Sequence, residues 1–348
     1  MNVVVGEVID RAGVAHWVNA ATSESDDMAE LGSVNARKLL ATLGRMADYA
    51  VHATWWARRH TAYLSISTMP PALYRDLVIW TIGAVTSPRI VIHVHTGDLS
   101  GLRPDGVLAP LRRWLMRRSE FWVLGSVLVG QLQAFGATDV RVVPNGVTCE
   151  SRHHREGRTA GPPAAEGDVR VVFLSHHFRS KGVDVVAELA EVLEDEPFAW
   201  TFAGSVVEPD TEAMLRPLGR LGPRYRRIEA VDADVRCRLL HQSDVFLLPS
   251  SYPHEASPLV LIEAMEHGVI PIVSSRGCMP EVVGRPDAVC NSTDEYAETL
   301  RLLAKDRGEL LHRSAEVSSR WRESYSRESF ERTIDTLLFP GAGGGAPA

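Results

Sequence analysis

Residues 244–268 read DVFLLPSSYPHEASPLVLIEAMEHG and join two apolar runs through a polar loop. The first run, at 245–248, is short and rich in large apolar side chains, which predicts a buried strand. Ser257-Pro258 favours a helix start, with the serine as N-cap and the proline, which has no N–H to satisfy, at the first helical position. The stretch therefore predicts a strand followed by a helix, the repeating unit of a sheet of parallel strands.

The same alternation of strands and helices continues along most of the chain. Candidate strands lie at 3–9, 63–67, 89–94, 121–124 and 140–143, and again at 169–174, 198–202, 227–230, 245–248 and 269–273. Helical patterns lie at about 13–22, 26–47, 70–84, 107–118, 126–135, 183–194, 210–219, 235–242, 258–267, 293–305, 308–319 and 321–338. Such alternation predicts an α/β fold with parallel sheets.

The alternation is interrupted once, which predicts two doubly wound domains. Residues 151–168 are polar, contain Gly and Pro and lack periodicity, so we interpret them as a linker. An N-terminal domain is expected at 1–150 and a C-terminal domain at 169–320. A last helix at 321–338 is expected to pack back on the N-terminal domain, and the Gly-rich tail at 339–348 is expected to be flexible.

Composition and charge limit the class of protein. With 348 residues, of which 45% are hydrophobic and 23% charged, the chain can form two globular domains. The net charge is −7, but residues 1–150 carry 14 basic and 13 acidic side chains, whereas the remainder carries 23 and 31. The two halves are therefore expected to face different partners, and the acidic whole argues against general nucleic-acid binding.

Cysteine usage and hydropathy favour a cytoplasmic protein. No two of the four cysteines are closely spaced: they are Cys149, Cys237, Cys278 and Cys290. We therefore expect neither a disulfide framework nor a cysteine metal site, which is consistent with a reducing compartment. The N-terminus has no basic region before its short apolar run, and the sequence contains no run of about 18 apolar residues. We expect neither a signal peptide nor a transmembrane helix.

The helix start predicted after the loop has the chemistry of an anion site. Ser257 with the N–H groups of Leu259 and Val260 forms the helix end, where the dipole attracts negative charge. Glu255 lies in the loop and Glu263 inside the helix, and carboxylates accept hydrogen bonds from hydroxyls. A diphosphate between two polyol rings, a nucleotide sugar, satisfies all of these groups. The alternative is that Glu263 pairs with an arginine and Glu255 is solvated.

At this point the sequence resembles a known family. Residues 255–283, EASPLVLIEAMEHGVIPIVSSRGCMPEVV, resemble the donor-site segment of the family 4 retaining glycosyltransferases. VVPNGV at 142–147, FRSKGVDVV at 178–186 and QSDVFLLPSS at 242–251 resemble other segments of that family. The resemblance extends over about 120–285 and implies the GT-B fold, two Rossmann-like doubly wound domains facing a central cleft.

The resemblance implies roles for individual residues. Glu255 would bind the hydroxyls of the donor sugar, Glu263 the nucleotide ribose, and Lys181 the diphosphate. The family usually has an arginine five residues before that lysine, but this chain has His176. Arg179 could supply the missing charge or be a solvated loop residue, and His176 could simply cap the strand.

The N-terminal domain carries weaker signals. His93 and His95 alternate near the end of a predicted strand, so they point to the same face. The resemblance implies a functional histidine there, and we favour His95, although either histidine can be a core residue and no third metal ligand is evident. Gly13 is a single glycine where the family has two, and it is counted among the residues that approach the donor.

Two further motifs have competing interpretations. Asp232 and Asp234 resemble a metal-binding pair, but they precede a predicted helix, where aspartate is a good N-cap, so no metal or cofactor is predicted. PLRRWLMRRSEFW at 110–122 predicts a basic amphipathic helix that either lies on an anionic membrane or is a solvated surface helix. The first alternative would place the protein at the inner face of a membrane.

The sequence as a whole predicts a metal-independent retaining glycosyltransferase. Lys181, Glu255 and His95 are the catalytic candidates, the nucleotide sugar is the donor, and the acceptor, whether glycan, glycolipid or natural product, stays open. An epimerase or hydrolase acting on the nucleotide sugar and a non-catalytic nucleotide-sugar-binding protein are the alternatives. A dinucleotide-dependent dehydrogenase is disfavoured because no G-x-G-x-x-G follows a predicted strand.

Overall fold

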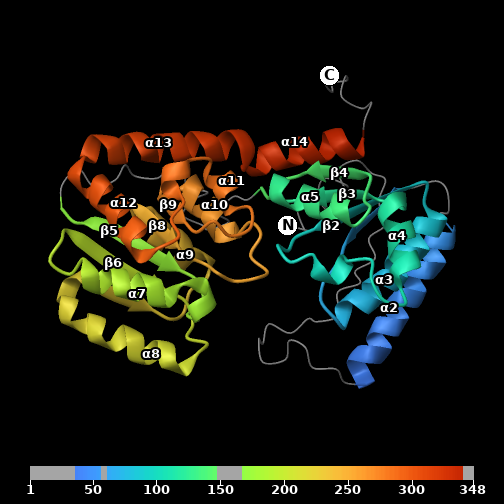
Figure 1. Cartoon of the computed structure of the whole chain (residues 1–348), viewed down its shortest axis with the longest axis horizontal. Helices are drawn as coiled ribbons and strands as arrows, with labels where there is room; N and C mark the ends of the chain where they lie inside the picture. The colour runs from blue at the N-terminus through green and yellow to red at the C-terminus, as the bar shows by residue number, and fades with distance from the viewer. Residues whose placement is uncertain (1–35, 56–60, 147–166, 340–348) are drawn as a thin grey trace. The chain divides into compact units, whose positions relative to one another are not determined.

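The computed structural model describes residues 36–55, 61–146 and 167–339. The chain divides into two compact units, Met1–Val143 and Pro144–Ala348. Each unit contains its own parallel β-sheet with helices packed on it (Figure 1). The α/β fold class predicted from the sequence is therefore confirmed.

The first unit is built on a sheet whose described strands follow the order β1-β2-β3-β4, all parallel. These strands are β1 (Thr61–Ser65), β2 (Arg89–Val94), β3 (Glu120–Val123) and β4 (Asp139–Val142). The accompanying helices are α2 (Ala36–Trp55), α3 (Ala72–Thr86), η2 (Ser100–Leu102), α4 (Ala109–Arg118) and α5 (Ser126–Ala134). Consecutive residues of β2 are buried, so both faces of the sheet are covered there.

The second unit has the strand order β7-β6-β5-β8-β9, again all parallel. Its strands are β5 (Val169–Leu174), β6 (Phe198–Ala203), β7 (Tyr225–Ile228), β8 (Val245–Leu248) and β9 (Ile270–Val273). The helices are η3 (Arg179–Lys181), α7 (Val183–Val192), α8 (Pro209–Leu215), η4 (Arg216–Arg224), α9 (Ala233–His241), α10 (Leu259–Glu266), α11 (Met279–Val283), η5 (Pro286–Ala288), α12 (Thr293–Lys305), α13 (Arg307–Ser324) and α14 (Arg327–Leu338).

The order of these strands creates a switch point between β5 and β8. From β5 the chain moves outward through β6 to β7, and it then returns to place β8 on the other side of β5. The loops that follow β5 and β8 consequently leave the sheet in opposite directions. In open α/β sheets, a crevice at the carboxyl ends of the strands opens at such a point.

Sequence and structure differ in some boundaries for identifiable reasons. The helix predicted at 210–219 ends at Leu215, because Pro217 in the following 3₁₀ segment has no N–H for an α-helical hydrogen bond. The break predicted near 320 lies at Tyr325-Ser326, where the Ser326 side chain caps α14 by accepting from the N–H of Ser329. The elements predicted at 3–9 and 13–22, most of the linker and most of the tail lie outside the described residues.

The cysteines differ from expectation. Cys278 and Cys290 are free and buried, but Cys237 in α9 is disulfide-bonded. Sequence spacing gave no sign of this bond, because a disulfide needs cysteines that the fold, not the sequence, brings together. The cysteines therefore do not decide the redox compartment.

No helix in the described part of the chain is both long enough and apolar enough to cross a membrane.

Candidate functional site

An ion pair lies at the switch point of the second sheet. Lys181 ends η3, just after β5, and Glu255 lies in the loop after β8, yet Nζ of Lys181 is 2.5 Å from Oε2 of Glu255. The two side chains are only 17% and 8% exposed, respectively. The fold thus brings together two of the three residues predicted to be catalytic.

Two further side chains hold this pair in place. The hydroxyl of Ser250 donates to the same Oε2 of Glu255 at 3.0 Å, and Nζ of Lys181 lies 4.8 Å from the centre of the Tyr252 ring. The ammonium of Lys181 thus contacts a carboxylate and an aromatic ring, and Oε2 of Glu255 accepts from both Lys181 and Ser250. An anionic ligand that binds Lys181 must therefore compete with Glu255 for it.

Two glycines let the loops after β5 and β9 approach the loop after β8 closely. Gly182 has a left-handed backbone, with φ +86°, and a Cβ there would lie 2.5 Å from the carbonyl oxygen of Pro249. Gly277, with φ +56°, packs equally tightly, because a Cβ would lie 2.3 Å from the carbonyl oxygen of Glu255. Any other residue would strain the backbone and push the loops apart, so both glycines belong to the architecture of the site.

The start of α10 corrects the sequence prediction. The N-cap is Pro258, whose φ of −61° and ψ of 131° are extended, so the helix begins at Leu259. Ser257 therefore lies one residue too early to cap, and its buried hydroxyl has no hydrogen-bond partner among the described residues. No side chain caps the N–H groups of Leu259 and Val260, which leaves this end of the helix open to an anion.

Glu263 is paired with an arginine, as one sequence interpretation allowed. Nε of Arg236 in α9 lies 2.7 Å from Oε2 of Glu263, and the Glu263 side chain is only 8% exposed. Burial raises the pKa of Glu263, while the charge of Arg236 opposes that rise. The arginine thereby favours the ionised form, in which both carboxylate oxygens can accept hydrogen bonds.

The basic residues after β5 are arranged differently from the prediction. Arg179 is about half exposed, and its guanidinium pairs with Asp210 at 2.8 Å, which raises the pKa of the arginine further. His176 is exposed, whereas His177 is buried beside Phe173, and burial lowers the pKa of His177 to about 4. Lys181 is thus directed at the loop after β8, whereas the charge of Arg179 is balanced by Asp210.

Arg276 is a cation that the sequence analysis missed. It follows β9, and its guanidinium donates to the carbonyl oxygens of Tyr252 at 3.0 Å and Pro253 at 2.6 Å. No acidic side chain pairs with it in the described part of the chain. Tyr252 therefore has Lys181 over its ring and Arg276 at its carbonyl, so two positive charges flank the loop that carries Glu255.

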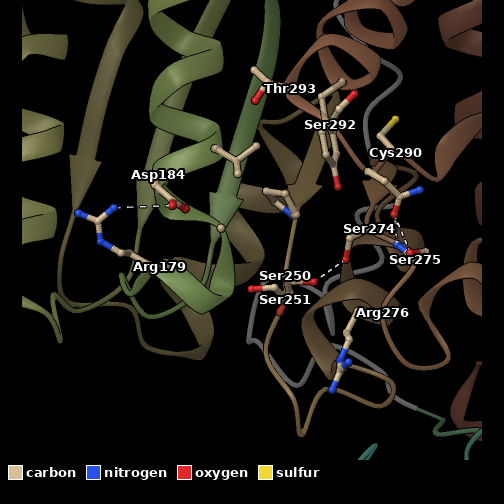
Figure 2. Close-up of a pocket in the computed structure, with 15 residues that line it drawn as sticks. Arg179, Asp184, Ser250, Ser251, Ser274, Ser275, Arg276, Cys290, Ser292 and Thr293 are labelled. Atoms are coloured by element: carbon tan, nitrogen blue, oxygen red, sulfur yellow. Dashed lines mark hydrogen bonds and ion pairs between the residues drawn. The ribbon is translucent and has the colours of Figure 1, made fainter.

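A pocket of about 510 Å³ adjoins the pair along the same edge of the sheet (Figure 2). Hydroxyl-bearing side chains from the loops after β8 and β9 and from the start of α12 line it: Ser250, Ser251, Ser274, Ser275, Ser292 and Thr293. Of the predicted site residues only Arg179 lines the pocket, while Gly182 and Ser250 connect it to Lys181 and Glu255. The pocket and the ion pair are neighbours, not one site.

In the first unit, the two histidines do lie on one face. The rings of His93 and His95 have centroids 4.1 Å apart. His93 is fully buried, its Nδ1 lies 2.6 Å from the hydroxyl oxygen of Tyr63, and burial holds the pKa of His93 well below its usual range. His93 is therefore a neutral core residue, and His95, beyond the end of β2, stays the functional candidate. Gly13 lies outside the described residues.

Asp232 is a helix cap. Its carboxylate accepts from the N–H of Val235 at 2.7 Å at the start of α9, as the preferred interpretation predicted. The described residues contain no cluster of three or more side chains of the types that bind metals. The structural role of Asp232 is to begin the helix that carries Arg236.

Comparison with known proteins gives one family match, which lies within the second unit. Residues 158–321 match the family described as glycosyl transferases group 1. No curated protein matches the chain by sequence.

Solved structures match the fold at low identity. Sucrose-phosphate synthase from Thermosynechococcus elongatus is 15% identical with a TM-score of 0.64, over 96% of this chain and 90% of that one. A glycosyltransferase from Rickettsia africae ESF-5 is 12% identical with a TM-score of 0.65, over 98% and 88%. Anabaena Alr3699/HepE in complex with UDP is 14% identical with a TM-score of 0.63, over 85% and 82%. The chain therefore has the GT-B fold, as its sequence predicted.

Replacing Gly182 with alanine should destabilise the second unit. The left-handed backbone and the contact with Pro249 predict a loss of about 1–3 kcal/mol in the free energy of unfolding, measured by urea denaturation. Gly219→Ala is the control, because nothing lies within 4 Å of a Cβ there. Equal losses in both variants would contradict the close packing at Gly182.

Replacing Asp232 with alanine should cost about 1 kcal/mol of stability, while Asp232→Ser, which keeps a capping oxygen, should stay close to the wild type. Thermal unfolding with and without EDTA separates a cap from a metal ligand. A melting temperature that EDTA lowers in the wild type but not in Asp232→Ser would show that Asp232 binds a metal.

Proposed function

We propose that the chain transfers a sugar from a nucleotide diphosphate sugar to an acceptor hydroxyl with retention of configuration, since residues 158–321 match the family described as glycosyl transferases group 1. The observation that carries the proposal is the Lys181–Glu255 pair beside the uncapped start of α10. These groups combine a cation, free N–H donors and a carboxylate within two loops at one sheet edge. A sugar joined to a diphosphate needs all three.

In the proposed complex, the donor replaces contacts that the protein makes with itself. The diphosphate binds Lys181 and the N–H groups of Leu259 and Val260, which releases Glu255 to accept hydrogen bonds from the sugar hydroxyls. Glu263, kept ionised by Arg236, accepts from the ribose hydroxyls. Each charged group is paired both before and after the donor binds.

The chemical step uses the same groups. As the bond between the sugar and the phosphate oxygen breaks, positive charge develops on the sugar and negative charge on the departing diphosphate. Lys181 and the end of α10 stabilise the charge that grows on the diphosphate, so they lower the barrier instead of only binding the donor. The acceptor oxygen forms the new bond to the anomeric carbon on the face from which the diphosphate leaves, and the leaving phosphate oxygen takes the proton of the acceptor hydroxyl. These steps need no metal ion, and His95 is proposed to contact donor and acceptor.

Uridine nucleotides are the first donors to test, and the pairing of Arg179 leaves a second candidate function. Solved structures of Anabaena Alr3699/HepE contain UDP or UDP-glucose, which makes uridine nucleotides the first donors to test. A second candidate function, non-catalytic binding of a nucleotide sugar, is favoured by the pairing of Arg179 with Asp210, which removes the second cation expected after β5. Arg276 is the group that could replace that cation.

A donor screen tests the proposed function. Nucleoside diphosphates should raise the melting temperature, and the matching nucleotide sugar should be consumed only when an acceptor is present. Conversion of the sugar without acceptor would indicate an epimerase or hydrolase, and binding without consumption across an acceptor panel would indicate a binding protein. No shift with any nucleoside diphosphate would overturn the donor site. Unchanged turnover in EDTA supports a metal-independent reaction.

Lys181→Ala should lower kcat/KM by at least about a hundredfold, because it removes the charge opposite the leaving diphosphate. Glu255→Gln should also lower kcat/KM, through lost hydrogen bonds to the sugar. Lys305→Ala is the matched control, since this exposed lysine at the end of α12 is remote in the fold from the β5–β8 loops. Initial rates with the identified donor provide the measurement, and wild-type rates in Lys181→Ala would disprove the role of the lysine.

Arg236→Met should make donor binding depend on pH. Without the arginine, burial alone acts on Glu263, so its pKa rises further and more of it is protonated as the pH falls. The KM for the donor should therefore exceed the wild-type value more at about pH 6 than at about pH 8. Arg236→Lys should restore much of the wild-type profile, and an increase in KM that is the same at both pH values would argue against this role.

A further inference from the structure

Helix α3 presents an apolar stripe on its exposed side. Tyr74, Val78, Ile82 and Val85 recur at helical spacing, and Tyr74, Val78 and Val85 are 54%, 45% and 70% exposed. The charged residues of the helix, Arg75 and Asp76, pair with each other at 2.6 Å. The stripe itself therefore carries no charge.

The stripe borders a groove shared with α4. The groove has a volume of about 470 Å³, and its lining is almost entirely apolar: Tyr74, Leu77, Val78, Thr81, Ile82, Leu108 and Leu111. The hydroxyl of Thr81 is turned to its own helix, where it donates to the carbonyl oxygen of Leu77 at 2.6 Å. Val107, at the edge of the groove, is 97% exposed. A continuous apolar surface of this kind usually marks a site of interaction.

Helix α4 packs beside α3 and carries, on its own exposed side, an aromatic ring and two cations without partners among the described residues. Trp114 is 42% exposed, and Arg113 and Arg117 are exposed without an ionic or hydrogen-bond partner among the described residues. The other arginines of the helix are engaged, since Arg112 pairs with Asp105 and Arg118 donates to backbone carbonyls. The face thus combines aliphatic side chains, a tryptophan and two free positive charges.

We infer that the face formed by α3 and α4 binds the surface of an anionic phospholipid bilayer. Aliphatic side chains of the stripe would enter the boundary of the acyl chains, Trp114 would lie at the level of the headgroups, and Arg113 and Arg117 would bind lipid phosphates. The inference takes up one of the two interpretations of residues 110–122, extends it to a second helix and goes beyond the proposed sugar transfer. It does not depend on that transfer.

Charge favours a membrane over a second copy of this chain. In a two-fold dimer through this face, the same patch of both copies would be buried, so the positive charges of Arg113 and Arg117 from both copies would enter one apolar interface. The chain also distributes its charge unevenly, with 14 basic and 13 acidic residues in 1–150 against 23 and 31 in the remainder. The half that carries this face is therefore the half that an anionic surface repels least.

Vesicle flotation with the full-length protein tests the inference. The wild type should float with vesicles of equal parts phosphatidylglycerol and phosphatidylcholine, and should float far less with pure phosphatidylcholine or at high salt. Val78→Asp and the double variant Arg113→Glu/Arg117→Glu should each bind at least about tenfold more weakly. Leu302→Asp in α12 and Arg322→Glu in α13, at exposed positions of the second unit, are the matched controls and should bind like the wild type.

Circular dichroism and melting temperatures establish that each variant is folded. Equal binding to both kinds of vesicle, or wild-type binding by Val78→Asp and the double arginine variant, would overturn the inference. A dimer in size-exclusion chromatography that Val78→Asp dissociates, with no vesicle binding, would assign the face to a second copy instead. Turnover of the donor in solution is measured separately, so failure of membrane binding and failure of sugar transfer are distinguishable.

Discussion

The site depends on how closely the loop after β5 approaches the loop after β8. These loops follow neighbouring strands at the switch point, and Gly182, with its left-handed backbone against Pro249, lets them pack closely. Lys181 is the residue before this glycine, so the contact determines where its ammonium lies. The ion pair with Glu255 is thus a consequence of backbone packing, and side-chain chemistry at the site follows from one steric constraint.

The Lys181–Glu255 and Glu263–Arg236 ion pairs are not expected to add much to the free energy of unfolding. Withdrawing a lysine and a glutamate from water costs several kcal/mol per ion, and their mutual attraction often does no more than offset that cost. The same holds for Glu263 with Arg236, where burial already raises the pKa of the carboxyl. The proposed donor site gives both pairs another role: Glu255 balances the charge of Lys181 until the diphosphate takes its place, and Arg236 keeps Glu263 ionised.

The sequence predicted what depends on local pattern. The strands at 89–94, 169–174 and 245–248 were located correctly because strands buried on both faces are nearly continuous runs of apolar residues. The start of α10 was misplaced by one residue because the backbone angle of Pro258 is set by its loop. The partner of Glu263 could not be named, since Arg236 lies 27 positions away in another helix. Long-range pairing of this kind has no signature in spacing.

Two arginines near the proposed donor site and two on the proposed membrane face differ in their partners, in keeping with what each pair would bind. In the second unit Arg179 and Arg236 are neutralised by carboxylates. A small ligand comes and goes, so charges in its site must be balanced while it is absent. In the first unit Arg113 and Arg117 stay in water without partners, where an exposed charge costs little and remains available to a large anionic surface.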